Sequence, residues 1–282
     1  MNVLLTGATG YIGSAVLRLL RSREHQVRAV VRSDESAKAA TAAGAEASVG
    51  EMTDIAWLTA QLRWADGAIH LAPLGPDGDD GMIAPVGAAF DRPDKPFIYT
   101  GGIWTWGNNL DITEDSEQRS AALTAWRVER QRRVLTSGLK ASVISPAAVY
   151  GHGKGIPAGV FTYGPRTEEG ALRLIGSGEQ HWATVHVDDL AELYVAVFER
   201  APGGEQYIGA SGVNPTVREM AQAAVGSAGT VAPESADRSR ARLGEQFADA
   251  LLLDQRASGA RAKQRFGWNP SRPTVLEELA AN

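Results

Sequence analysis

The sequence of 282 residues contains no cysteine. Disulfides, thiolate metal sites and cysteine nucleophiles are therefore excluded. No apolar run approaches the roughly 18 residues that a membrane-spanning helix needs. The N-terminus, MNVLLTGATG, has neither the basic segment nor the small-residue cleavage site of a signal peptide. These absences predict a soluble cytoplasmic protein.

A large excess of charge of either sign is also missing. The formal net charge is -5, and 22% of the residues are charged while 44% are hydrophobic, which is ordinary for a globular protein. Such a chain has no general attraction to nucleic acid or to an anionic membrane, so neither is an expected partner. The expected partner is a small-molecule substrate, and assembly into a homodimer is left open.

Apolar runs alternate with helical patterns through the first half of the chain. The patterns predict strands over 2–6, 26–32, 45–50, 66–72, 96–102 and 139–146, and helices over 11–22, 34–44, 54–64 and 123–134. Strands that alternate with helices indicate parallel pairing and right-handed crossovers. The fold class is therefore α/β, with a doubly wound parallel sheet.

Two segments lack this regularity. Residues 73–96 are rich in proline, glycine and aspartate and are expected to hold at most one short helix, and residues 151–170 resemble a loop. Helices are predicted again over 188–200 and 216–225, on either side of a strand over 205–210.

The stretch LLTGATGYIG places Gly7, Gly10 and Gly13 between the first strand and the first helix. Glycine lets the backbone turn tightly and approach a phosphate closely. The N-terminus of the helix then offers unpaired N–H groups to a pyrophosphate. Because the motif follows a strand and opens a helix, it predicts a dinucleotide site rather than a simple turn.

The end of the second strand distinguishes the two nicotinamide cofactors. A carboxylate at this place bonds the ribose hydroxyls of NAD, whereas arginine suits the 2′-phosphate of NADP. The strand ends in Val31 and Arg32, and the first acid is Asp34. The sequence therefore predicts NADP(H), with a solvated surface arginine as the alternative interpretation of Arg32.

The motifs TGATGYIG, IHLA, FIYTGGIWTWG, SPAAVYG, TVHVDDLAELY and RFGWNP occur in that order, and the chain resembles the extended short-chain dehydrogenase/reductases. The resemblance implies a Rossmann-type sheet with a small C-terminal substrate-binding lobe. The expected boundaries are 1–150 plus about 187–228 for the NADP-binding domain, and about 151–186 plus 229–282 for the lobe. The implied cofactor contacts are Gly7, Thr9, Gly10, Tyr11, Ile12, Gly13, Arg32, Leu71, Ala72, Arg130 and Pro146.

The catalytic motif of that family is absent from this chain. Its Tyr-x-x-x-Lys pair aligns with Trp126 and Arg130, and its serine aligns with Gly101 or Gly102. The nearest hydroxyl is that of Thr100. Indole donates a hydrogen bond but does not titrate usefully, and arginine stays protonated. The usual proton transfer therefore cannot be carried over.

The substitutions leave several candidates for catalysis. Arg127, helped by Thr100, would stabilise a developing negative charge, unless it forms only a surface ion pair. His152 or water would deliver the proton, and His181 is a further candidate. The expected enzyme is an NADP(H)-dependent oxidoreductase. A redox-neutral isomerase, lyase or cyclase, or a non-catalytic NADP(H) sensor, is the alternative.

The substrate expectation depends on the tryptophans. Trp182 stands where nucleotide-sugar enzymes of the family carry a phosphate-gripping arginine, so nucleotide sugars are not expected as substrates. Together with Trp104, Trp106 and Trp126 it is predicted to line one aromatic cleft, although at least two of these side chains are expected in the core. An apolar or aromatic carbonyl, enone or imine fits such a pocket.

The histidines give no sequence signal for a metal. No spacing such as His-x-x-x-His occurs, so no metal site is predicted. His186 and Asp188, in VHVDDLA, are expected to have structural roles, and His70 is expected to line the cofactor groove.

Overall fold

The computed structural model describes residues 1–72, 75–76, 80, 82–90 and 92–281. The chain forms two compact units. The first comprises 1–101, 129–145 and 191–207, and the second comprises 102–128, 146–190 and 208–282. The segments 102–128 and 208–228, which the sequence assigned to the cofactor domain, thus belong to the second unit. The reason for 208–228 is that the apolar face of its helix packs in that unit's core.

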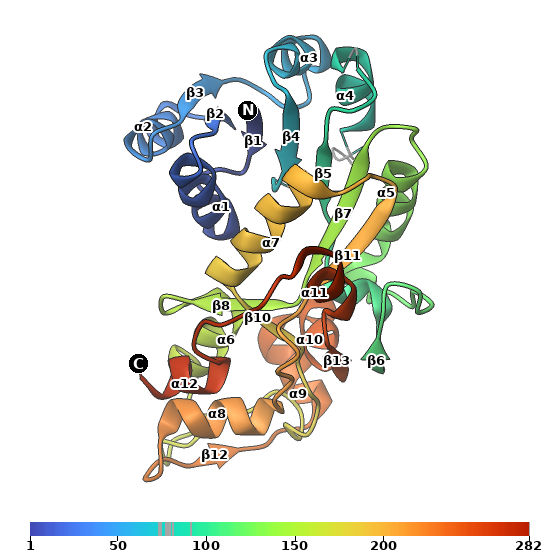
Figure 1. The fold of residues 1–282 in the computed structure, drawn as a ribbon. Helices are drawn as coiled ribbons and strands as arrows, with labels where there is room; N and C mark the ends of the chain where they lie inside the picture. The colour runs from blue at the N-terminus through green and yellow to red at the C-terminus, as the bar shows by residue number, and fades with distance from the viewer. Residues whose placement is uncertain (73–74, 77–79, 81, 91, 282) are drawn as a thin grey trace. The chain divides into compact units, whose positions relative to one another are not determined.

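The first unit is built on a seven-stranded sheet with the strand order β11-β7-β5-β4-β1-β2-β3 (Figure 1). The pairs β7–β5, β5–β4, β4–β1, β1–β2 and β2–β3 are all parallel. The strands are β1 Asn2–Thr6, β2 Gln26–Val31, β3 Glu46–Val49, β4 Gly67–His70, β5 Phe97–Thr100, β7 Ala141–Pro146 and β11 Glu205–Gly209. The doubly wound parallel sheet is therefore confirmed.

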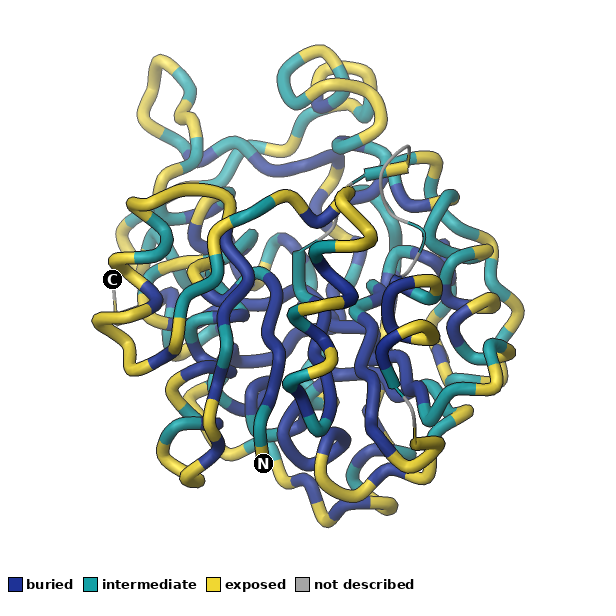
Figure 2. The backbone as a smooth tube through the Cα atoms, turned by 90° about the horizontal axis from the view of Figure 1, so that it is seen from above, coloured by how far each residue is buried: buried dark blue, intermediate teal, exposed yellow. Residues whose placement is uncertain are grey.

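Helices cover both faces of this sheet (Figure 1). They are α1 Tyr11–Ser22, α2 Asp34–Ala42, α3 Ile55–Arg63, α4 Ile83–Ala89, α5 Ala125–Leu135 and α7 Val187–Arg200. One buried cluster joins Leu58 and Leu62 of α3, Val86 of α4 and Val134 of α5 to the sheet. The strands β4 and β7 are buried along their whole length. The helical turns in Figure 2 carry both buried and exposed residues, as amphipathic helices do.

The second unit contains three two-stranded parallel pairs, β8–β10, β9–β12 and β6–β13. Its strands are β6 Asn109–Ile112, β8 Ala148–Gly151, β9 Leu172–Arg173, β10 Thr184–His186, β12 Val231–Ala232 and β13 Gln255–Ala257. Its helices are α6 Gly155–Pro157, α8 Val217–Val225, α9 Ala236–Leu243, α10 Glu245–Leu251, α11 Ala260–Phe266 and α12 Val275–Ala280, with 3-10 turns at Ile103–Trp106 and Ala122–Thr124.

Two capping boxes start the helices that close this unit's core. Thr216 and Glu219 cap α8, and Thr274 and Glu277 cap α12, each threonine accepting a backbone N–H while the glutamate bonds the threonine N–H. Such caps satisfy amides that a helix leaves unpaired. They fix the residue at which each helix begins, and the two helices then bury Met220 and Val275 in the core.

Most sequence expectations for the elements hold, with one correction. The predicted short helix within 73–96 is α4, although residues 73–74, 77–79, 81 and 91 of that segment lie outside the described residues. The loop predicted over 151–170 is wrong in part, because α6 and a π-helical turn, Ala158–Thr162, occupy it. Buried Ala158 and Phe161 explain the turn, since they pack inward from a glycine-rich sequence that shows no helical period.

The described helices include none that is both long enough and apolar enough to cross a membrane.

Candidate cofactor and active site

The glycine loop lies where β1 ends and α1 begins. Gly7 has φ +69°, and the Gly10 N–H donates to the Gly7 carbonyl over 3.0 Å, which closes the turn. A Cβ at Gly13 would lie 1.9 Å from the Gly7 oxygen, so only glycine fits there. Gly10 precedes α1 and has no side chain that could bond the amides of the first turn. This arrangement suits a pyrophosphate.

Thr6 ties the glycine loop to the end of β4. Its Oγ1 accepts the N–H groups of Leu71 (3.1 Å) and Ala72 (3.3 Å) and lies 2.8 Å from Nδ1 of buried His70. With two donors already on the oxygen, the hydroxyl hydrogen goes to Nδ1, so a neutral His70 carries its proton on Nε2. The order β4-β1-β2 makes this the switch point of the sheet, where such folds bind ligands.

Thr100 belongs to an internal chain of hydrogen bonds. Its hydroxyl donates to the His70 carbonyl over 2.7 Å and lies 2.9 Å from the hydroxyl of buried Tyr194. A hydroxyl has a single hydrogen, so Tyr194 donates to Thr100. The threonine could donate to a substrate oxygen only after breaking its bond to His70, which weakens its candidacy as an oxyanion donor.

Arg32 is exposed at the end of β2 and precedes the cap of α2. Ser33 caps that helix by accepting the Ser36 N–H over 3.2 Å. Val31 is buried, and no carboxylate stands at the strand end before Asp34, in the first turn of α2. The guanidinium is thus the charged group at the position that contacts the adenosine ribose in this fold.

The helix predicted to carry the catalytic substitutions is α5. Arg127 places its guanidinium carbon 4.5 Å from the centre of the Trp126 ring, a cation–π contact within the first turn of the helix. Arg130 donates from Nη2 to the carbonyl of Pro76 over 2.9 Å. Pro76 follows β4, so Arg130 bonds the segment that continues from Leu71 and Ala72.

Gly101 and Gly102 are the two glycines that the sequence comparison aligns with the family's serine, and the structure distinguishes their surroundings. A Cβ at Gly101 would lie 2.6 Å from Oγ of Ser145 and 2.8 Å from Oε1 of Gln131, whereas one at Gly102 would meet nothing within 4 Å. Gln206 donates to the same Gln131 oxygen over 2.8 Å and to Ser145 over 3.0 Å. These buried polar groups fill the space beside Gly101. Sequence reasoning missed them because glutamine and serine carry no motif there.

The prediction that four tryptophans line one aromatic cleft is wrong for two of them. Trp106 and Trp182 are buried in the second unit, where their indole N–H groups donate to the carbonyls of Ser116 and Leu251. Trp182 also packs against Phe161. The expectation that at least two tryptophans are core residues is confirmed. Hydrophobic burial places large aromatic rings inside wherever their one polar atom finds an acceptor.

The half-buried Trp104 has a different neighbour. Its ring lies edge-on to that of Phe247, with 6.2 Å between the ring centres. This residue, unlike Trp106 and Trp182, keeps part of its surface outside the core.

The histidines of the second unit are paired with carboxylates. Nδ1 of His181 lies 2.9 Å from Asp254, which also accepts the His181 N–H over 2.8 Å. Nε2 of His152 lies 2.8 Å from Oδ2 of Asp188. His152 was predicted as a proton donor, and this contact occupies one of its two ring nitrogens. Pro146, a predicted cofactor contact, ends β7 and is buried.

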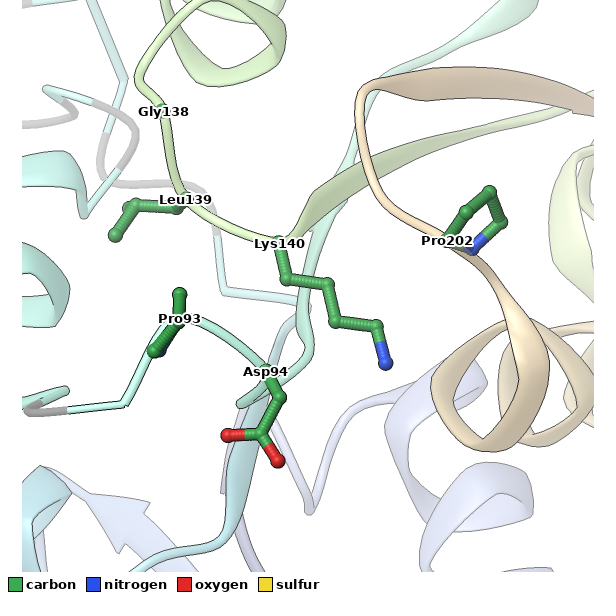
Figure 3. A pocket seen from close by; sticks show the side chains of 6 residues that line it. All are labelled: Pro93, Asp94, Gly138, Leu139, Lys140 and Pro202. Atoms are coloured by element: carbon green, nitrogen blue, oxygen red, sulfur yellow. The ribbon is translucent and has the colours of Figure 1, made fainter.

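The first unit also has a hollow at the end of its sheet opposite the glycine loop. Pro93, Asp94, Gly138, Leu139, Lys140 and Pro202 line it (Figure 3). Residues 93–94 and 138–140 come just before β5 and β7, so the hollow is at the amino ends of these strands. Parallel α/β sheets bind ligands at the carboxyl ends, so this hollow is separate from the glycine loop.

Comparisons with known proteins agree with this geometry. The NAD(P)H-binding family profile matches residues 7–201. The chain is 26% identical to a 4-hydroxy-2-methyl-3-oxo-4-farnesyl-3,4-dihydroquinoline-1-oxide ketoreductase of Stigmatella aurantiaca, covering 93% of this chain and 85% of that protein. It is 26% identical to a 3-diazoavenalumate denitrifying reductase of Streptomyces sp, covering 99% of each. A human epimerase family protein solved with NADPH superposes with a TM-score of 0.75 at 21% identity, covering 100% of this chain and 98% of that one.

Proposed function

The chain belongs to the NAD(P)H-binding family of extended short-chain dehydrogenase/reductases, and from this premise we propose that it is an NADP(H)-dependent reductase of an apolar or aromatic carbonyl, enone or imine. The observation that carries the proposal is the intact glycine loop, which Thr6 joins to Leu71 and Ala72 at the switch point of the sheet. Reductase relatives support hydride transfer as the chemistry.

The proposed mechanism uses arginine where the family uses tyrosine. NADPH supplies the hydride, and Arg127, stacked on Trp126, stabilises the negative charge that develops on the substrate oxygen or nitrogen. Water delivers the proton, because His152 and Thr100 direct their hydrogen-bonding groups to Asp188 and His70. A missing general acid costs about 10²–10⁴-fold in rate, which a strong electrophile tolerates.

Arg130 is proposed to serve the cofactor. Guanidinium has five N–H donors, and one of them holds the Pro76 carbonyl. We assign another to the nicotinamide ribose, as the family's lysine does. The arginine would then join the ribose to the segment after β4.

Stereospecifically deuterated NADPH tests the reaction. Incubation with aromatic and apolar ketones, enones and imines should place deuterium at the reduced carbon of the product, as mass spectrometry detects. Turnover with NADP⁺ and NADPH equally effective would replace the reductase by a redox-neutral isomerase, lyase or cyclase. Cofactor binding without any turnover would indicate a sensor of NADP(H).

The cofactor preference has its own test. Titration calorimetry should find NADPH bound more tightly than NADH, because the planar donors of Arg32 pair with the 2′-phosphate. Arg32→Asp should reverse the preference, since a carboxylate repels that phosphate and accepts ribose hydroxyls. The control variant is Arg63→Asp, because Arg63 is exposed at the end of α3. Arg28 is unsuitable as a control because it pairs with Glu46. Equal affinities of the native chain for the two cofactors would contradict the assignment.

A further inference from the structure

His152 meets His186 and Asp188, which lie much later in the sequence, at one end of the pair β8–β10. Tyr150 of β8 is in register with His186, the last residue of β10. The chain then turns sharply, since His152 has φ +55° between Gly151 at +130° and Gly153 at +66°. This turn brings the imidazole of His152 to 5.3 Å from that of His186, measured between ring centres.

Asp188, in the first turn of α7, completes the group. Its Oδ2 lies 2.8 Å from Nε2 of His152 and 4.0 Å from Nδ1 of His186. One ligand atom from each residue lies within 4.8 Å of the others. Tetrahedral zinc with bonds near 2.0–2.1 Å separates its ligands by roughly 3.3 Å, so small side-chain adjustments would bring the three atoms to coordination distance. We propose that His152, His186 and Asp188 bind a divalent transition-metal ion of the zinc type.

The chemistry of each donor fits such an ion. Two imidazoles and one carboxylate, with a water as fourth ligand, form a donor set that zinc accepts. The Asp188 N–H donates to Nδ1 of His186 over 3.1 Å, which fixes a lone pair on that nitrogen.

For Nδ1 to bind the metal, the His186 ring would turn away from this N–H, which now lies on the axis of the lone pair. The amide lies in the first turn of α7, where N–H groups have no partner within the helix, so water can accept its hydrogen. The side chain of His152 is 57% exposed, which gives an ion and its water access to the group. Asp188, Asp189 and Glu278 surround His186 with negative charge that favours a cation. His152, His186 and Asp188 are all in the second unit, so the inference is independent of the proposed reductase activity.

The full chain is produced without an affinity tag, and a chelator removes any bound metal ions. It is then titrated with Zn²⁺ by calorimetry and with Co²⁺ by absorption spectroscopy. We expect one saturable site per chain, and Co²⁺ bands of low-symmetry nitrogen–oxygen coordination. His152→Ala and Asp188→Asn should each weaken the binding of Zn²⁺ by about 10- to 100-fold, which is the usual effect of removing groups that support a metal. Zn²⁺ should raise the Tm of the native chain and not that of His152→Ala.

His181→Ala is the matched control, because His181 also pairs with an aspartate in the same unit but belongs to no three-ligand group among the described residues. It should bind both ions as the native chain does. His152 is exposed, so circular dichroism should show that its alanine variant folds. Absence of saturable binding to the native chain, or equal affinity in His152→Ala, would overturn the proposal.

Discussion

Arg127→Ala should lower kcat for the reduced substrate by about 10²–10³-fold, the usual effect of removing one donor that stabilises a developing oxyanion. The affinity for NADPH should stay unchanged, because Arg127 is assigned to the substrate and not to the cofactor. Stopped-flow measurement of NADPH oxidation gives kcat, and the quenching or enhancement of NADPH fluorescence gives its dissociation constant.

Three other variants separate the roles of the arginines in α5. Arg127→Lys keeps the charge but loses the planar donors, so it should recover only part of the rate. Arg130→Ala should weaken NADPH binding as well as turnover, since its guanidinium also holds the Pro76 carbonyl. Arg133→Ala, at an exposed position in the last turn, should change neither. If Arg127→Ala kept the native kcat, the proposed oxyanion donor would be wrong.

Gly13→Ala should destabilise the first unit and abolish measurable NADPH binding. The new Cβ would lie 1.9 Å from the Gly7 oxygen and 3.1 Å from the Cα of Ala8, so the turn must open. Both close contacts are backbone atoms, which cannot rotate away. Overpacking of this kind costs roughly 1–3 kcal/mol or more of unfolding free energy. Opening the turn also displaces the amides that face the pyrophosphate.

Gly87→Ala provides the control for this prediction. Gly87 is a helical glycine of α4 in the same unit, and a Cβ there meets nothing within 4 Å. Alanine should therefore leave NADPH affinity intact and stabilise the helix by up to about 1 kcal/mol. Thermal unfolding and NADPH titration of both variants decide the matter, and native-like behaviour of Gly13→Ala would show that the loop does not need glycine.

Much of the cofactor site was predictable from sequence because its parts are local. The turn at Gly7, Gly10 and Gly13 lies in one stretch between a strand and a helix, and its chemistry depends on backbone conformation that only glycine adopts easily. The periods of apolar residues likewise predicted the elements of the parallel sheet. Arg32 could be proposed as a contact of the 2′-phosphate because the end of the second strand has a fixed place in this fold.

The environment of the substituted catalytic positions was not predictable in this way. Whether Gly101 could hold a side chain depends on Ser145 in the neighbouring strand and Gln131 in α5, which reach it only in the folded sheet. From the sequence, Trp106 and Trp182 could equally line an aromatic pocket. In the structure each is buried, and its indole N–H donates to a backbone carbonyl. Burial is a property of the whole packing and not of any short pattern.

The α/β alternation, the parallel sheet and the glycine turn could be predicted from the sequence, because each follows from the backbone preferences of neighbouring residues. The grouping of His152, His186 and Asp188 is visible only in the folded chain. Their meeting requires the register of β8 against β10 and the left-handed turn at His152. Contacts across 34 residues depend on how two strands pair, and no spacing along the chain specifies that pairing.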